Sequence, residues 1–230
     1  WQRLSHSILN RKQNSTDRLE CKKSLLPWYV SKLSGSEFFA DVVELDLDSA
    51  VDKIWAQKYP TVSEINAMTA IGTHMFLNES MLLEIDGPVV VVGSIRGQFD
   101  DLKAIFSKMG DPSKTRYLFL GDIVDRGKFS TLCISLILLY KIKFPRNIYL
   151  IRGKHECASI NRIYGFYDEM KRHYGLIQPW KRFSNVFNSL PLAAIVSKQY
   201  WCASAGLSPE LQRAESLKSI VRPTDVPDQG

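Results

Sequence analysis

Between residues 88 and 151 short apolar runs alternate with helical runs, and this alternation constrains the fold more than any other feature of the chain. The apolar runs read as strands and the segments between them as helices: strands 88–92, 116–120 and 147–151, with helices 99–109 and 135–142. Continuously apolar strands separated by helices are typical of a mostly parallel sheet that is buried on both faces. The sequence therefore predicts an α/β domain.

Further elements flank this core on both sides. Helical spacing at residues 49–59 and 62–80 predicts two leading helices, with Ser63 as the N-cap of the second. A long helical stretch follows the core, and residues 192–196 and 200–204 then form a predicted β-hairpin. The domain is thus expected to gain antiparallel character late in the chain.

Composition and charge exclude several classes of protein. The chain has 230 residues, 45% of them hydrophobic, which suffices for a buried core. No apolar run approaches the roughly 18 residues that span a bilayer, so we expect no membrane association. The net charge of +6 is concentrated in residues 1–24, which hold six Lys or Arg against two acidic residues. The remainder is nearly balanced, which argues against a dedicated nucleic-acid binder.

The same charge pattern divides the chain into two parts. Residues 1–45 lack a clear period and are rich in Ser, Asn, Lys and Arg, so we predict a basic, loosely structured N-terminal extension. Docking of residues 25–30 on the body is the alternative. Residues 46–230 form the predicted domain. The four cysteines show no CxxC spacing, which indicates reduced thiols and a cytoplasmic or nuclear location: Cys21, Cys133, Cys157 and Cys202.

Each of the three alternating strands ends in glycine followed by polar residues. The junctions begin at Gly93, Gly121 and Gly153, 28 and 32 residues apart. Loops beyond the carboxyl ends of parallel strands line the ligand crevice of open α/β sheets, and glycine permits close approach of the backbone. A single such glycine would only turn the chain, whereas three with charged residues after them predict one shared site.

The central loop, GDIVDRG, is the most informative of the three. It places two carboxylates and a guanidinium within five residues: Asp122, Asp125 and Arg126. Carboxylates suit a hard metal ion or a paired histidine, and a guanidinium suits phosphate. Asp125 beside His155 would form an acid pair, in which the carboxylate orients the imidazolium. A plain Asp–Arg salt bridge at the base of a loop is the alternative.

Four motifs give the chain a resemblance to a known family: GDIVDRG, RGKHECASINRIYGFYDEMKRHYG, GLSPEL and RPTDVPDQG. They resemble the metallophosphoesterase core of the protein serine/threonine phosphatases, with the type-1 catalytic subunits most similar, over residues 48–230. The resemblance implies a β-sandwich flanked by helices, which here is expected to be truncated at the C-terminus. It also implies two divalent metal ions (Mn, Fe or Zn) that activate a water for hydrolysis of phosphoserine and phosphothreonine.

The resemblance also assigns roles to residues, and most of the metal-ligand positions depart from the family pattern. Asp122 matches the bridging metal ligand and is the one ligand that remains. The other four ligand positions that the chain covers hold residues unsuited to the role: Ser94, Arg96, Lys154 and Ser204. His155 and Asp125 match the general acid and its partner, and Arg126 matches a phosphate clamp. One carboxylate cannot hold two divalent ions, so we expect no metal cofactor.

The substitutions at Arg96 and Lys154 both introduce cations where metal ligands are expected. We hypothesise that their charges neutralise the nearby carboxylates Asp122, Asp125 and Glu156. With Arg126, the two cations would also form a phosphate-binding cup. The alternative is a cluster of salt bridges that satisfies itself. Tyr164 and its aromatic neighbours are assigned to core packing.

These observations favour a pseudophosphatase, a binding or scaffold protein for other proteins, including phosphoproteins. A genuine but weak phosphoserine/phosphothreonine phosphatase is the alternative, completed by one ion at Asp122 or by residues beyond 230. A non-functional product of a duplicated gene is the third. If the chain is a fragment of a longer protein, the truncation of the domain is no longer expected.

Overall fold

The computed structural model describes residues 45–204, 206–209 and 211–226, so the predicted basic extension lies almost wholly outside the described residues. Two helices lead into the domain, α2 (Leu47–Trp55) and α3 (Val62–Leu77). Both were predicted, but the N-cap of α3 is Thr61 and not Ser63. Thr61 Oγ1 accepts the N–H of Glu64 and the Glu64 carboxylate accepts the N–H of Thr61, which forms a capping box.

The predicted parallel sheet is present. Its strands are β2 (Val90–Val92), β3 (Tyr117–Phe119) and β4 (Ile148–Leu150), in the order β2-β3-β4. Both pairings are parallel, and the register aligns the carboxyl-terminal residues of the three strands. The connecting helices are α4 (Phe99–Met109) and α5 (Ser130–Lys143). Helix α5 is buried over nearly its whole length, which explains its continuous apolar sequence.

A second three-stranded sheet has the order β1-β5-β6. The hairpin of β5 (Ala193–Val196) and β6 (Tyr200–Ala203) is antiparallel, as predicted. Strand β1 (Leu82–Ile85) was not predicted. It pairs in parallel with β5, more than a hundred residues later, so nothing local in the sequence marks it as a strand.

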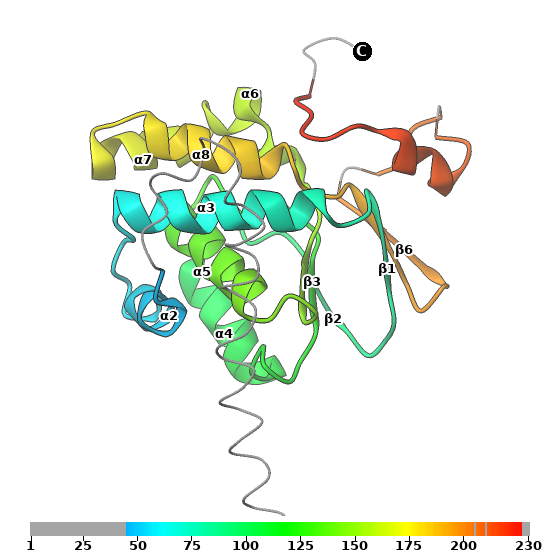
Figure 1. Cartoon of the computed structure of the whole chain (residues 1–230), viewed down its shortest axis with the longest axis horizontal. Coiled ribbons are helices and arrows are strands. Elements are labelled where there is room, and N and C mark those ends of the chain that lie inside the picture. The colour runs from blue at the N-terminus through cyan, green and yellow to red at the C-terminus, as the bar shows by residue number, and fades with distance from the viewer. Residues whose placement is uncertain (1–44, 205, 210, 227–230) are drawn as a thin grey trace, which may run out of the picture. The chain divides into compact units, whose positions relative to one another are not determined.

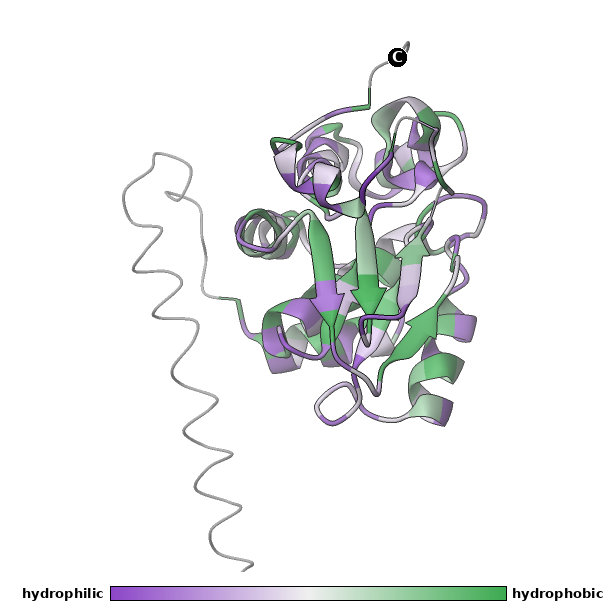
Figure 2. Cartoon of the chain, turned by 90° about the vertical axis from the view of Figure 1, so that its right-hand side faces the viewer, coloured by the Kyte–Doolittle hydropathy of each residue, from purple (hydrophilic) through white to green (hydrophobic). Residues whose placement is uncertain are grey.

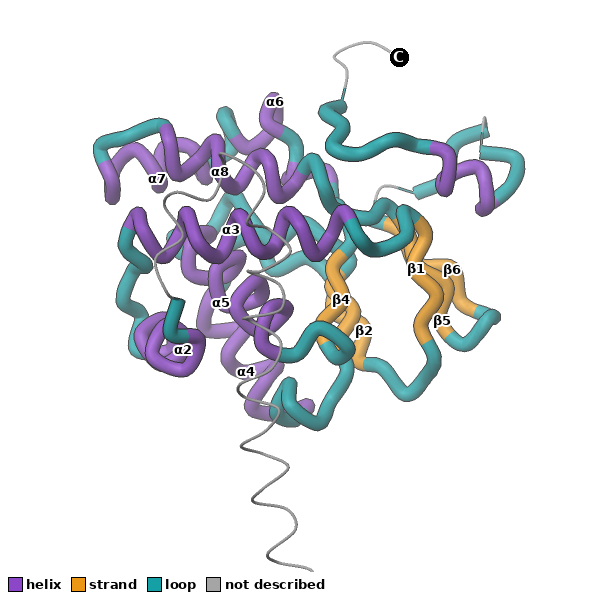
Figure 3. Tube along the Cα trace, viewed as in Figure 1, coloured by secondary structure: helices purple, strands orange, loops and turns teal. Residues whose placement is uncertain are grey.

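The two sheets face each other and form the predicted β-sandwich. An apolar cluster joins β1 and β5 of one sheet to β3 and the end of β4 in the other: Leu83, Ile85, Leu118, Ile151, Ala194 and Val196. In Figure 3 the helices α2 to α8 lie on one side of the β2-β3-β4 sheet, and the other sheet lies opposite. Figure 2 shows apolar residues along most of the strands and on parts of the helices.

The long helical stretch predicted after the core is three helices: α6 (Ala158–Asn161), α7 (Phe166–Tyr174) and α8 (Gln178–Phe187). Gly175 ends α7 with a left-handed backbone, which breaks the continuous helical spacing. In Figure 1, α8 lies beside α3, and α7 packs against α8. A 3₁₀ turn, η4 (Ala214–Ser219), packs Leu217 against Leu82 and Ala193 of the β1-β5-β6 sheet.

Within the described part of the chain, every helix is too short or too polar to cross a membrane.

Candidate functional site

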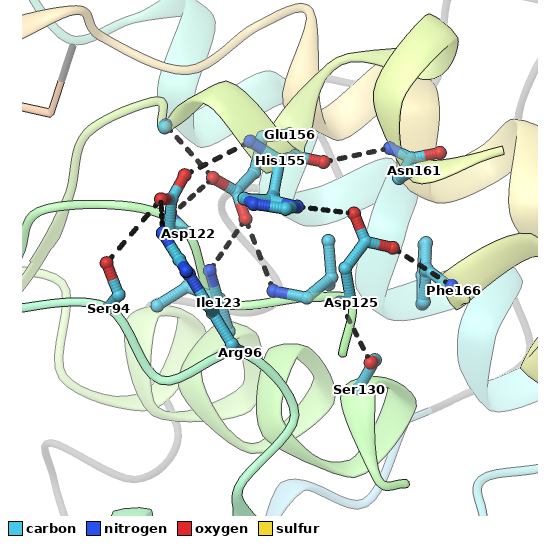
Figure 4. Close-up of polar contacts among 12 residues, drawn as sticks. Ser94, Arg96, Asp122, Ile123, Asp125, Ser130, His155, Glu156, Asn161 and Phe166 are labelled. Atoms are coloured by element: carbon cyan, nitrogen blue, oxygen red, sulfur yellow. Dashed lines mark hydrogen bonds and ion pairs between the residues drawn. The ribbon is translucent and has the colours of Figure 1, made fainter. Parts of the chain in front are cut away.

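The three glycine-led loops meet at one edge of the β2-β3-β4 sheet, as the sequence predicted. The backbone N–H groups of Ile95 and Arg96 donate to the carbonyl of Asp122 at 3.0 and 2.9 Å. The N–H of Gly127 donates back to the carbonyl of Arg96 at 2.8 Å. The first and second loops are therefore joined by their main chains, and Figure 4 shows their side chains converging with those of the third.

The second and third loops pass in direct contact at Gly121 and Gly153. A Cβ atom on Gly153 would lie 2.2 Å from the backbone nitrogen of Asp122, and one on Gly121 would lie 2.3 Å from the nitrogen of Gly153. No side chain fits at either position. Glycine is therefore required here by the close approach of two backbones.

A buried carboxylate, Glu156, organises the junction. Its Oε2 accepts the N–H groups of Asp122 at 2.7 Å and Gly153 at 2.9 Å, and its Oε1 accepts that of Ile123 at 2.8 Å. Burial raises the pKa of Glu156, and these hydrogen bonds oppose the rise. From the sequence, Glu156 was expected only to be a charge that nearby cations neutralise. The structure shows that backbone donors, and not Lys154, surround this carboxylate.

His155 and Asp125 form a closely held pair. Nδ1 of His155 lies 2.7 Å from Oδ2 of Asp125, and Oδ1 of Asp125 accepts the N–H of Phe166 at 3.0 Å. Both side chains are buried, and burial raises the pKa of Asp125 while the imidazole acts in the opposite direction. The contact with Asp125 uses Nδ1 and fixes the orientation of the ring. Nε2 is therefore the ring nitrogen that would transfer a proton. This geometry suits the predicted general-acid pair.

Asp122 faces Arg96. Nη2 of Arg96 lies 3.1 Å from Oδ2 of Asp122, while Oδ1 accepts the backbone N–H of His155 at 3.1 Å. Ser94 Oγ lies 3.5 Å from Oδ2, a marginal contact. The Asp122 side chain is 10% exposed and that of Arg96 is 47% exposed. The predicted neutralisation of Asp122 by a cation at position 96 is therefore present.

Lys154 does not share this role. Its side chain is exposed, and no hydrogen bond or ion pair joins its ammonium group to another described residue. The expectation that Lys154 neutralises the carboxylates is corrected accordingly: its Cα lies in the loop, but the side chain extends into solvent.

Arg126 and Tyr164 form a stack at the rim of the site. The guanidinium carbon of Arg126 lies 4.3 Å from the centroid of the Tyr164 ring, and the N–H of Arg126 donates to the Tyr164 carbonyl at 3.1 Å. The same ring meets the imidazole of His155 edge-on, with centroids 5.8 Å apart. Tyr164 is 39% exposed, so its assignment to core packing is wrong. That assignment is right for Phe166, which is fully buried.

Four non-glycine residues of the first two loops have left-handed backbones: Arg96, Asp122, Asp125 and Arg126, with φ between 48° and 75°. This conformation is unfavourable for residues with a Cβ and concentrates at functional sites. The hydrogen bonds that backbone N–H groups donate to Glu156, and those between the loops, hold this conformation in place. No feature of the sequence signalled the strain.

The donor set does not fit the two metal ions that the family resemblance implies. Among the described residues, no three His, Cys, Asp or Glu side chains lie close enough together to hold a metal ion. Asp122 has a guanidinium against it, and the remaining expected ligand positions, including Ser204 after β6, carry hydroxyl or cationic groups. Cations repel a divalent ion, and neutral hydroxyls are weak ligands.

The fold and the motifs define a phosphoesterase-like protein. Residues 87–230 match the family model of the calcineurin-like phosphoesterases, so the chain belongs to that family. A solved structure of a protein serine/threonine phosphatase from Saccharomyces cerevisiae, described as similar to human phosphatase PP5, shares 32% identity with a TM-score of 0.73. That match covers 80% of this chain and 62% of the yeast chain.

A cold-active protein-tyrosine phosphatase of a psychrophilic Shewanella species matches at 15% identity with a TM-score of 0.48, over 59% of this chain and 47% of the other.

Proposed function

We propose that this protein is a pseudophosphatase, a phosphatase-like domain formed by residues 46–230 that binds other proteins without hydrolysing phosphate esters. One observation carries the proposal: Arg96 forms an ion pair with Asp122, the one ligand position that still holds a carboxylate. A divalent ion at Asp122 would have to displace a guanidinium from a largely buried carboxylate. Among the described residues, no three His, Cys, Asp or Glu side chains lie close enough together to hold it.

The preserved packing around the site supports a binding role. Glu156, Gly121 and Gly153 still hold the three loops together, although the ligand positions have changed. Loops held in this way can present an ordered surface to other proteins, including phosphoproteins. The proposed setting is the cytoplasm or the nucleus, consistent with free thiols at Cys133, Cys157 and Cys202.

A second candidate is a weak phosphoserine/phosphothreonine phosphatase, and the His155–Asp125 pair favours it. The pair has the geometry of a general acid held by a carboxylate.

Phosphate release decides between the two candidates. The purified protein is incubated with a phosphoserine peptide, with and without Mn²⁺, and inorganic phosphate is followed over time. The pseudophosphatase proposal predicts no release above that of a His155→Ala, Asp122→Ala double variant. If phosphate were released in a metal-dependent way, and the double variant did not release it, the weak phosphatase would be the correct candidate.

A further inference from the structure

We infer that the turn between α7 and α8 is a docking surface for an acidic segment of another protein. Five residues form this turn surface: Lys171, Arg172, Leu176, Ile177 and Lys181. An apolar side chain of the partner would lie against the leucine and the isoleucine, and its carboxylates would lie against the three cations. The turn surface is separate from the strand-end loops, so the inference goes beyond the proposed function.

Two adjacent apolar side chains are exposed in this turn. Leu176 is 54% exposed and Ile177 is 47% exposed, whereas the apolar residues of α8 itself, from Trp180 to Phe187, are buried. Apolar surface left in water costs about 25 cal/mol per Å². Single exposed apolar side chains are common, but neighbouring ones form a patch, and such patches indicate a binding site for another molecule.

The turn that carries this apolar pair is held in place on both sides. Gly175 ends α7 with a left-handed backbone, which sets the direction of the turn. Before it, the hydroxyl of Tyr174 donates to the carbonyl of Pro60 at 2.8 Å. After it, Nε1 of Trp180 donates to Oδ1 of Asn161 at 2.7 Å. A surface that is ordered before the partner arrives loses less entropy when the partner binds.

The cations of the turn surface have no acidic partner of their own. Lys171 and Arg172 belong to the last turn of α7, and Lys181 is the fourth residue of α8. All three side chains are exposed, and none forms a hydrogen bond or ion pair with a described residue. The exposed acid of α7, Asp168, is three residues before Lys171, and no ion pair joins the two. Residues 175–187 contain no acid, so carboxylates of another protein would complement this charge.

Helix stability accounts for only part of this charge. Lys171 and Arg172 lie at the C-terminal end of α7, where cations interact favourably with the helix dipole. Lys181 lies near the N-terminal end of α8, where a cation interacts unfavourably with the dipole. The position of Lys181 therefore favours an interaction outside its own helix.

The composition of the turn surface favours a protein over a membrane as the partner. Sequences that bind anionic lipids carry clusters of about four to eight Lys or Arg, and interfacial segments commonly insert Trp or Phe. The turn surface has three cations and no aromatic residue. A short acidic segment with one or two apolar anchors matches both its charge and its small apolar patch.

Helix α7 separates the turn surface from the strand-end loops. At the start of α7, the N–H of Phe166 donates to Oδ1 of Asp125 at 3.0 Å. The turn follows the other end of this nine-residue helix, about 13 Å away along the helix axis. In Figure 1 it lies at the end of α8 that points away from the strands. A partner can therefore dock here whether or not the site hydrolyses phosphate.

A random peptide library displayed on phage is the probe, selected against the full chain at low ionic strength. We expect the enriched peptides to combine Asp or Glu with an apolar residue. Synthetic copies should bind the double variant Lys171→Glu, Lys181→Glu about tenfold or more weakly than the unmodified chain. The double variant Leu176→Ser, Ile177→Ser should show a similar loss. Added salt should weaken binding to the unmodified chain.

Helix α4 supplies the matched control. Lys108 lies in its last turn, and the neighbouring Met109 is 51% exposed, so this helix end also presents one cation and one apolar side chain. The double variant Lys108→Glu, Met109→Ser should bind the peptides as the unmodified chain does. Thermal melting shows that each variant is folded. Because the two turn-surface variants change different side chains, either one tests the surface if the other unfolds.

Three results would overturn the docking surface. The first is a selection that enriches no acidic peptide. The second is acidic peptides that bind both turn-surface variants as tightly as the unmodified chain. The third is binding to vesicles of phosphatidylcholine and phosphatidylserine that both variants lose, without peptide binding, which would make a membrane the partner. Phosphate release from a phosphoserine peptide would contradict the pseudophosphatase and leave this surface unaffected.

Discussion

The guanidinium of Arg96 lies against the carboxylate of Asp122, with Nη2 3.1 Å from Oδ2, at the point where three strand-end loops converge. A cation of the protein itself thus neutralises Asp122. The resemblance to the protein phosphatases assigns metal binding to the carboxylate at this position. The carboxylate remains hydrogen-bonded on its other oxygen by the backbone of His155. Hydrogen bonds and an ion pair within the protein therefore hold the three loops in place.

This relationship predicts different effects for the two basic substitutions at the site. Arg96→Gln should lower the free energy of unfolding by about 1 kcal/mol, because Asp122 loses its partner while staying largely buried. Lys154→Asn should change it by less than about 0.5 kcal/mol, because the exposed ammonium has no described partner. Chemical denaturation in EDTA measures both, and a larger loss for Lys154→Asn would contradict the assignment.

The contact between loops predicts that Gly153 cannot be replaced. Gly153→Ala should cost about 3 kcal/mol or more, or prevent folding, because the new Cβ would lie 2.2 Å from the backbone nitrogen of Asp122. Gly93→Ala is the matched control, since its Cβ would have no neighbour within 4 Å. If both variants melted at the same temperature, the close approach of the loops would be wrong.

Helix α3 offers a test of its N-cap. Thr61→Ala should destabilise the protein by about 1 kcal/mol, because it removes the acceptor for the N–H of Glu64. Ser63→Ala, two residues later within the helix, should have little effect. Urea denaturation of the two variants compares them directly, and the opposite order would restore Ser63 as the cap.

Much of the fold could be predicted from sequence because its signals are local. Residues 88–92, 116–120 and 147–151 are apolar runs, and helix α4 carries its own period and ends at a glycine. Strand β1 has only four residues and depends on β5 for its pairing, so no local pattern marks it. Convergence of the loops followed from parallel topology, since the carboxyl ends of such strands share one edge.

The details of the site depended on the directions in which side chains extend, which a sequence does not contain. Arg96 and Lys154 are both basic substitutions in glycine-led loops, yet one side chain turns to Asp122 and the other to solvent. Glu156 looked like one more charge, whereas its position between two loops makes it an acceptor for several backbone donors. Tyr164 belongs to an aromatic run, but only the fold shows which ring is exposed.

Tyrosines that are buried or half-buried in the fold predict an alkaline limit to stability. Burial raises the pKa of Tyr117 to about 12 and also raises the pKa values of Tyr59 and Tyr174. The unfolded chain loses these phenolic protons near pH 10, while the folded chain retains them to higher pH. The free energy of unfolding should therefore fall as pH rises from about 10 to 12.

Tyr117→Phe should reduce the steepness of this fall, because the variant has one phenol fewer to ionise on unfolding. Tyr200→Phe, at an exposed side chain, serves as control. Denaturation at a series of pH values measures the slope, and an equal slope in wild type and Tyr117→Phe would argue against the contribution of Tyr117.

The metal content per chain shows most directly whether the site excludes the two metal ions. The protein is incubated with Mn²⁺, desalted and analysed for metal, beside an active phosphatase of the family and a variant with Ser94→Asp, Arg96→His, Lys154→Asn and Ser204→His. We predict a content near zero for the unmodified chain and a higher content for the variant, whose substitutions supply ligand-type groups. About two ions per unmodified chain would contradict the exclusion of metal from the site, since the site would then hold the metals that hydrolysis requires.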